Sequence, residues 1–309
     1  MARPPAPPGG APAASGVLVV DKPPHVTSHD VVAAIRRHLD RAKVGHTGTL
    51  DPFATGVLPL VVGKATRLAQ HLTAGEKTYE ADIRLGRTTD TFDSTGQVQH
   101  DAGPDAVLPS AGAVAAALET FRGTWLQTPP AFSAKHLDGA RAYEQARRGV
   151  AVDLPAVEVT VSALELIEAG AGLVRVRLVC SAGFYVRAFA HAFGERLGCG
   201  ACLEALRRTR SAGFGLDAAV PLERMLLDGP AAYLRPMHTL LTGWPGVSVT
   251  AEGLDRVGHG REVGPAHMAP PVASLPAGTR ARLLGPDGAL LALAEAGPDG
   301  SLRPSVVLM

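Results

Sequence analysis

The chain has 309 residues, of which 46% are hydrophobic, so it can bury a sizeable core and form one large domain with a smaller one, or two comparable domains. The formal net charge of +1 gives no global argument for a nucleic-acid partner, so any such argument depends on local patches. No apolar run approaches the roughly 18 residues of a membrane span, and three cysteines make no disulfide framework. We therefore expect a cytoplasmic protein with no membrane partner.

The first 245 residues alternate irregularly between strand and helix patterns. Residues 1–15 are rich in Pro, Ala and Gly, which predicts a disordered tail. A buried strand is predicted over 16–20, and Thr27 or Ser28 caps the helix that follows it. This irregular order favours an α+β domain around a mixed, mainly antiparallel sheet. Further strands are predicted over 57–62, 77–85, 157–166 and 173–180, and further helices over 66–72, 113–121, 140–148 and 184–197.

A boundary is predicted near residues 243–246, where Gly, Trp and Pro interrupt the pattern. Beyond it, Asp-Gly pairs at 287–288 and 299–300 are typical of hairpin turns. The expected organisation is therefore one domain over 16–245 and a small β-rich domain over 246–309. Strands of this second domain are predicted over 281–284, 290–294 and 305–308.

The loop GHTGTLDPFATGVL, residues 45–58, places a single carboxylate, Asp51, among glycines. Glycines allow positive φ and close backbone approach, and Pro52 biases Asp51 toward an extended backbone. Leu50 and Phe53 give the carboxylate apolar neighbours, which suits nucleophilic or acid–base catalysis. A surface Asp-Pro turn explains the same pattern equally well.

Two further residues, Tyr79 and Arg187, have a structural and a functional interpretation. Tyr79 shares a strand face with Lys77 and Ala81, a pattern more typical of half-buried packing than of a site. Arg187 stands at a predicted helix start, where it either pairs with a buried carboxylate or decorates the first turn. The chain lacks a phosphate-binding loop, a dinucleotide fingerprint and zinc-ligand spacing, which disfavours those enzyme classes.

Three basic clusters could bind phosphates if they converge on one face, although such runs are more often solvated. The members of the clusters are Arg36, Arg37, Arg41 and Lys43 in the first, Arg141, Arg147 and Arg148 in the second, and Arg207, Arg208 and Arg210 in the third.

Seven stretches in order resemble the TruB family of tRNA pseudouridine-55 synthases, and the resemblance covers most of residues 16–245. The tail over 246–309 resembles the PUA-like RNA-binding module of this family, with less specific motifs. The matching stretches are GVLVVDKP (16–23), VGHTGTLDPFATGVL (44–58), KTYEA (77–81), RLGRTTDT (84–91), QTPPAFSA (127–134), CSAGFYVR (180–187) and LRRT (206–209).

The resemblance implies that Asp51 is the nucleophile of a cofactor-free, metal-free isomerisation that attacks either C6 of the base or C1′ of the ribose. It implies that Tyr79 stacks on a flipped base and that Arg187 pairs with Asp51 and holds it ionised. The other expected substrate-binding residues are Tyr185, Lys22 and Leu206 near the pocket, and His46, which holds the T-loop of tRNA.

The implied partner is the T arm of tRNA, bound by a monomer without a guide RNA. Two other readings remain: an RNA-folding chaperone for which isomerisation is secondary, and a guide-RNA-dependent synthase. The intact set of Asp51, Tyr79 and Arg187 favours the enzyme over the chaperone. The long basic extensions usual in guide-dependent synthases are not seen in this sequence. Arg67 departs from the lysine often found at its position.

Overall fold

The computed structural model describes residues 15–103, 105–132, 136–137, 140–141, 154–269 and 275–309. The expected tail lies outside the described residues except for Ser15, and so does most of the helix predicted over 140–148. The first two residues of that prediction, Ala140–Arg141, form strand β9, paired with β8 (His136–Leu137), so the helix is wrong at its start.

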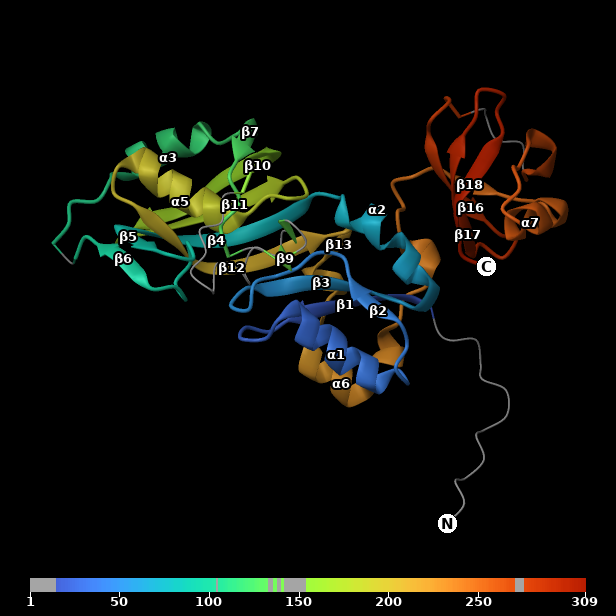
Figure 1. The fold of residues 1–309 in the computed structure, drawn as a ribbon, viewed down its shortest axis with the longest axis horizontal. Coiled ribbons are helices and arrows are strands. Elements are labelled where there is room, and N and C mark those ends of the chain that lie inside the picture. Colours follow the sequence, from blue (N-terminus) through green and yellow to red (C-terminus); the bar gives the residue numbers. More distant parts are fainter. Residues whose placement is uncertain (1–14, 104, 133–135, 138–139, 142–153, 270–274) are drawn as a thin grey trace, which may run out of the picture.

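A ten-stranded sheet forms the body of the molecule, with strand order β14-β1-β3-β12-β4-β11-β10-β7 (Figure 1). Strands β2 and β13 attach to β3 and β12. Only the β1–β14 and β3–β12 pairs are parallel, so the expected mixed, mainly antiparallel sheet is confirmed. The strands are β1 (Gly16–Lys22), β2 (Val44–His46), β3 (Thr55–Val62), β4 (Lys77–Leu85), β7 (Gly123–Gln127), β10 (Val157–Gly170), β11 (Leu173–Cys180), β12 (Ala201–Ser211), β13 (Phe214–Gly215) and β14 (Val220–Pro221).

Strand β4 follows the predicted alternation over its full length, because every second residue from Lys77 to Leu85 is buried. Its neighbour β12, by contrast, is not predicted by the sequence. Two register shifts, between Leu203 and Ala205 and between Arg208 and Arg210, break the period of two on which a strand prediction depends.

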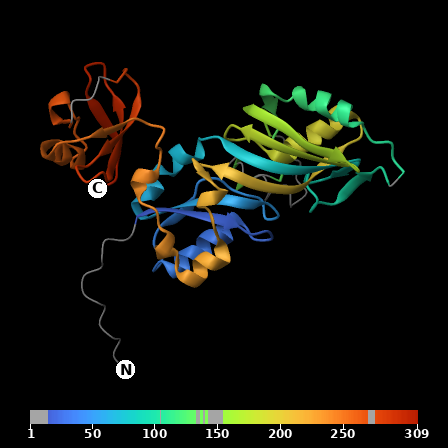
Figure 2. The same ribbon diagram turned by 180° about the vertical axis from the view of Figure 1, so that it is seen from behind.

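Helices α1, α3 and α5 pack on one face of the sheet in a shared apolar core, and Figure 2 shows from behind that α1 lies toward one end of the sheet and α3 and α5 toward the other. Helix α2 packs on the opposite face, where Leu72 contacts the apolar residues of β1 and β3. Thr27 caps α1 with a capping box, and the predicted residues Val31 and Ile35 are buried beneath it. The helix predicted over 184–197 is α5, which ends at Gly198 in the left-handed conformation. The helices are α1 (Ser28–His38), α2 (Ala69–Thr73), α3 (Ala111–Glu119), α5 (Val186–Leu197) and α6 (Leu222–Asp228), with 3-10 turns η1 (Gly63–Leu68), η2 (Leu216–Ala218), η3 (Pro230–Tyr233) and η4 (Met237–Thr239).

A separate four-stranded sheet forms the C-terminal part of the chain, as the hairpin signals indicate. This part of the chain contains two elements that the sequence does not predict, the parallel strand β15 (Gly246–Ser248) and the helix α7 (Ala251–Gly258). The division into domains at residue 246 stays a prediction. The remaining elements of this part are β16 (Arg280–Leu284), β17 (Leu290–Ala296), β18 (Leu302–Val307) and η5 (Pro265–His267). A separate hairpin, β5 (Arg87–Thr89) and β6 (Val98–Asp101), lies at the end of the large sheet that is away from the C-terminal part (Figure 1).

One apolar cluster joins the C-terminal part to the large sheet. It packs Leu290 and Leu293 of β17 with Val17 of β1, Leu68 of η1 and Leu240. Deletion of residues 246–309 would expose these side chains to water, so a truncated protein would lose stability as well as any RNA contacts. No helix in the parts of the chain described is long and apolar enough to cross a membrane.

Candidate active site

The loop between β2 and β3 is tied down on both sides of Asp51. Before it, the Leu50 amide donates to the Ser28 hydroxyl at 2.8 Å, and the Leu50 side chain is buried. After it, the Pro52 carbonyl accepts from the His25 amide at 2.8 Å and from Lys22 Nζ at 3.1 Å. These contacts hold the backbone of Asp51 in place and leave its side chain 32% exposed at the surface of a cavity.

Arg208 supports the same loop from within the sheet. It is fully buried, and its guanidinium donates to the carbonyls of Val57 at 2.8 Å, Gly48 at 3.0 Å and Thr49 at 3.3 Å. The hydrogen bonds leave none of its three nitrogens facing solvent for a phosphate. The prediction that Arg208 belongs to a phosphate-binding cluster is therefore wrong, because β12 turns this residue toward the loop.

Gly56 is required where β3 meets β12. Its φ is +103°, and a Cβ atom at this position would lie 2.2 Å from the Arg208 carbonyl oxygen. Any side chain would push β12 away from the loop and with it the Arg208 guanidinium. The glycine noted in the sequence thus serves close backbone approach.

Asp51 and Arg187 form a two-pronged ion pair. Arg187 Nε lies 2.9 Å from Asp51 Oδ2, and Nη2 lies 3.0 Å from Oδ1. Arg187 comes from the first turn of α5, and only 5% of its surface is exposed. A paired geometry of this kind fixes the orientation of the carboxylate. The structure therefore selects the pairing interpretation of Arg187 over decoration of the helix surface.

A second carboxylate, Asp93, approaches the same guanidinium. Asp93 Oδ2 lies 3.6 Å from Arg187 Nε, and its Oδ1 accepts from Thr95 Oγ1 at 2.6 Å and from Thr91 Oγ1 at 2.8 Å. The Thr91 carbonyl also accepts from Arg187 Nη1 at 3.0 Å. Sequence reasoning missed Asp93, whose only signal was its place in a polar segment two residues after the RLGRTTDT match ends at Thr91.

The cavity in front of Asp51 has a volume of about 240 Å³. Tyr79, Tyr185, Arg187 and Leu206 line it together with Asp51, so the structure brings five of the seven expected site residues to one place. Burial raises the pKa of the Tyr79 phenol, while the nearby Arg208 lowers it by a smaller amount. The phenol is therefore neutral at physiological pH.

Gln127 holds the part of the cavity wall that comes from the start of α5. The buried Gln127 amide donates to the Tyr185 carbonyl at 3.0 Å, and its oxygen accepts from the Tyr185 amide at 2.8 Å. This pair joins the end of β7 to the residue that precedes α5. It thus sets where the first turn of α5, and Arg187 with it, begins.

Lys22 and His46 lie outside the cavity lining. Lys22 is fully buried beneath the loop, where it donates to the carbonyls of Val26 and Pro52. Desolvation lowers its pKa to about 8, although the nearby Asp51 raises it. His46 sits on β2 with its Nδ1 accepting from the Gly48 amide at 3.4 Å, and burial lowers its pKa, so the ring is neutral.

Among the described residues, the first of the three basic clusters is exposed at all four of its members. Arg36, Arg37, Arg41 and Lys43 are exposed at the end of α1 and in the loop that leads to His46; we call these four residues the α1 patch. Arg207 pairs with Asp21 at 2.8 Å, and Arg147 and Arg148 lie outside the described residues. In the described part of the chain, the third cluster therefore does not offer Arg207 and Arg208 as free phosphate contacts, since one is paired and the other is buried.

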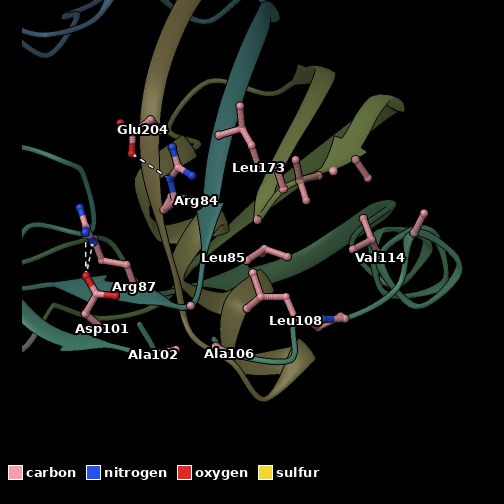
Figure 3. A pocket seen from close by; sticks show the side chains of 18 of the residues that line it. Arg84, Leu85, Arg87, Asp101, Ala102, Ala106, Leu108, Val114, Leu173 and Glu204 are labelled. Carbon is pink, nitrogen blue, oxygen red and sulfur yellow. Dashed lines mark hydrogen bonds and ion pairs between the residues drawn. The ribbon is translucent and has the colours of Figure 1, made fainter. Parts of the chain in front are cut away.

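A larger cavity, about 920 Å³, lies at the opposite end of β4 (Figure 3). Its two arginines are each paired with an acid, Arg87 with Asp101 at 2.6 Å and Arg84 with Glu204 at 3.6 Å. Its floor is apolar, with Leu85 and Leu108 labelled in Figure 3. Volume alone would favour this cavity, but the carboxylate–guanidinium–phenol arrangement is found in the smaller one.

Comparison with known proteins agrees with this geometry. Residues 36–186 match the model of the TruB family pseudouridylate synthase (N terminal domain). A protein of Solibacter usitatus named tRNA pseudouridine synthase B is 43% identical over 299 residues, which cover 95% of this chain and 99% of that protein. A protein of the same name from Geobacter sulfurreducens is 42% identical and covers 91% of this chain and 93% of its own.

Solved structures extend the similarity to chains of multi-component complexes. A chain in the "Structure of H/ACA RNP bound to a substrate RNA containing 2'-deoxyuridine" matches with a TM-score of 0.73 at 26% identity, over 95% of this chain and 85% of that one. A chain in the "Crystal Structure of a Cbf5-Nop10-Gar1 Complex" matches with the same TM-score at 27% identity and the same coverage.

Proposed function

Since the chain belongs to the TruB family of pseudouridylate synthases, and is thus an isomerase that forms pseudouridine in tRNA, we propose that its target is uridine 55 in the T-loop and that Asp51 is the nucleophile. The observation that carries the proposal is the Asp51–Arg187 ion pair at the wall of the 240 Å³ cavity. A site of this size is smaller than the roughly 300–1,000 Å³ that drug-sized ligands fill, which suits one flipped base.

The reaction needs a carboxylate that is ionised, oriented and able to leave again. The glycosidic bond between N1 and C1′ breaks, the base turns, a bond forms between C5 and C1′, the C5 hydrogen leaves as a proton and N1 gains one. Asp51 attacks either C1′ of the ribose or C6 of the base, and both routes begin from a carboxylate fixed against the target nucleotide. Arg187 keeps Asp51 aimed at the cavity before the substrate enters.

The remaining residues divide into those that touch the base and those that hold the loop. Tyr79, Tyr185 and Leu206 line the cavity, so we assign them to contacts with the flipped nucleotide, with the Tyr79 ring packing on the uracil. Lys22 has no exposed surface, so we assign it to positioning the loop through the Pro52 carbonyl. His46 lies in the chain between Lys43 of the α1 patch and Asp51, and we assign it to holding the T-loop while its target base is out of the stack.

We further propose that the chain acts without a guide RNA, on the T arm alone. The relatives that share 42–43% identity over nearly the whole chain carry a tRNA-specific name, whereas the chains of the H/ACA RNP and the Cbf5-Nop10-Gar1 complex share only 26–27%. The experiment is to incubate purified protein with unmodified tRNA and no other RNA, and to map pseudouridine by position. We expect modification at uridine 55 with wild type, and none with Asp51→Asn.

The Asp51→Asn variant also addresses chaperone activity. This variant keeps the size and burial of the side chain, so we expect it to fold and to bind tRNA nearly as wild type does. If it still accelerates tRNA refolding, the two activities coexist in one protein. Turnover of Asp51→Asn near the wild-type rate would refute the nucleophile assignment, and modification only after addition of a guide RNA would refute the direct mechanism.

A further inference from the structure

Phe92 has a left-handed backbone, with φ of 63°. This conformation is uncommon for a bulky residue because the Cβ atom crowds the neighbouring carbonyl. On one side of Phe92, the Thr91 carbonyl accepts from Arg187 Nη1 at 3.0 Å; on the other, the Asp93 carboxylate lies 3.6 Å from Arg187 Nε. The turn at Phe92 thus directs both neighbouring residues toward the guanidinium that holds Asp51.

The Phe92 ring packs on the helix that carries Arg187. It stacks on the His191 ring with centroids 3.9 Å apart and planes 8° from parallel. His191 lies one turn after Arg187 in α5, so both side chains are on the same side of the helix. The backbone of the segment is attached to β12, because the Leu203 amide donates to the Phe92 carbonyl and the Ser94 amide to the Leu203 carbonyl, both at 2.9 Å. The segment is therefore held between α5 and β12.

Hydrogen bonds from the ring nitrogens do not account for the position of His191. Within the described part of the chain, Nδ1 is buried without a hydrogen-bond partner, and Nε2 lies 3.6 Å from the exposed Glu195 carboxylate. What the imidazole offers the segment is its flat face. The His191 ring stacks on the Phe92 ring, and this contact helps to hold the uncommon backbone conformation of Phe92.

We propose that Phe92 is a positioning residue for the catalytic ion pair: its stack on His191 holds residues 91–93 against Arg187 and so aligns the guanidinium with Asp51. The inference rests on the proposed function, because it is the reaction of Asp51 that the alignment serves. It does not involve the base-contacting residues, since neither Phe92 nor His191 lines the cavity.

The test compares variants that remove the stack with one that keeps it. Phe92→Ala and His191→Ala remove one ring each, Phe92→Gly removes the ring and relieves the backbone, and His191→Phe keeps a ring without nitrogens. We expect the single-turnover rate at saturating tRNA to fall about tenfold or more in the first three variants, with tRNA affinity within about twofold of wild type. His191→Phe should restore most of the rate. The double variant Phe92→Ala/His191→Ala should be no slower than either single variant, because each substitution alone already abolishes the same stack.

Val98→Ala is the matched control, because Val98 is an exposed side chain of β6, the strand that follows residues 91–93, and its truncation should leave the rate unchanged. Circular dichroism and thermal unfolding establish that each variant is folded. Rates of Phe92→Ala and His191→Ala within twofold of wild type, additive losses in the double variant, or losses in affinity alone would each overturn the inference. A wild-type protein that forms no pseudouridine would instead refute the proposed function.

Discussion

Charged residues on the two faces of strand β4 differ in their exposure to water. On the buried face, Lys77 and Tyr79 line the cavity together with Arg187 and Arg208, which have almost no exposed surface. On the outer face, Glu80 and Asp82 pair with Arg177 and Arg175 of β11 at 2.8 and 2.6 Å, in contact with water. We call these four residues the outer ladder. An arginine in this protein is therefore informative about function only once its face of the sheet is known.

The environments differ in what a lost charge would leave behind. Arg187 serves two carboxylates and two carbonyls, and Arg208 serves three carbonyls, all of them partly or fully shielded from water. Removing either leaves buried groups without a partner, which costs much more than the pair itself contributes. Removing a member of the outer ladder returns its partner to solvent.

The largest effect is expected for Arg187→Ala. The substitution removes both hydrogen bonds to Asp51 and leaves the buried Asp93 carboxylate without its guanidinium. We expect the single-turnover rate to fall about a thousandfold, because Asp51 loses its orientation and the positive charge beside it. The measurement is pseudouridine formation at saturating tRNA, with tRNA affinity measured in parallel. If Arg187→Ala and the wild type had equal rates across the pH range, the ion pair between Arg187 and Asp51 would have no role in catalysis.

The next largest effect is expected for Arg208→Met, which fills a similar volume without the three donors. Three carbonyls of the catalytic loop would lose their partner, which predicts a loss of about 3 kcal/mol or more in the free energy of unfolding. Arg208→Lys restores the charge but not the planar fork and should recover only part of the loss. Urea unfolding measures both variants, and a midpoint equal to wild type for Arg208→Met would show that the loop holds itself.

Arg208 also shows where sequence reasoning failed. Asp51, Tyr79 and Arg187 could be named because specific motifs surround them, and β4 could be bounded because its alternation is unbroken. Strand β12 has two irregularities, so its arginines looked like a surface cluster, and only the parallel pairing with β3 turns Arg208 inward. Asp93 is 42 residues from Asp51 and gains its meaning only through their shared partner Arg187, which no local pattern encodes.

A smaller effect is expected from the α1 patch. The joint substitution Arg36→Ala/Arg37→Ala/Arg41→Ala should weaken tRNA binding and lower the slope of log affinity against log salt by roughly 0.7–0.9 for each phosphate that the protein no longer neutralises. All tRNA sequences should be affected alike, because phosphate contacts position the RNA and do not read it. The matched control is Arg175→Ala/Arg177→Ala in the outer ladder, which should keep the wild-type slope. A slope unchanged by the α1 substitutions would move the phosphate-binding surface elsewhere.

The smallest effect is expected for Arg177→Ala. Arg177 reaches Glu80 at 2.8 Å and Glu165 at 3.2 Å, so the distances alone resemble those between Arg187 and Asp51. Its side chain is 48% exposed, however, and water and salt screen both pairs, so the carboxylates are hydrated as soon as the guanidinium is gone. We expect a thermal midpoint within about two degrees of wild type and an unchanged single-turnover rate. If Arg177→Ala lowered the single-turnover rate as much as Arg187→Ala does, hydrogen-bond distance, and not burial, would decide what these arginines contribute.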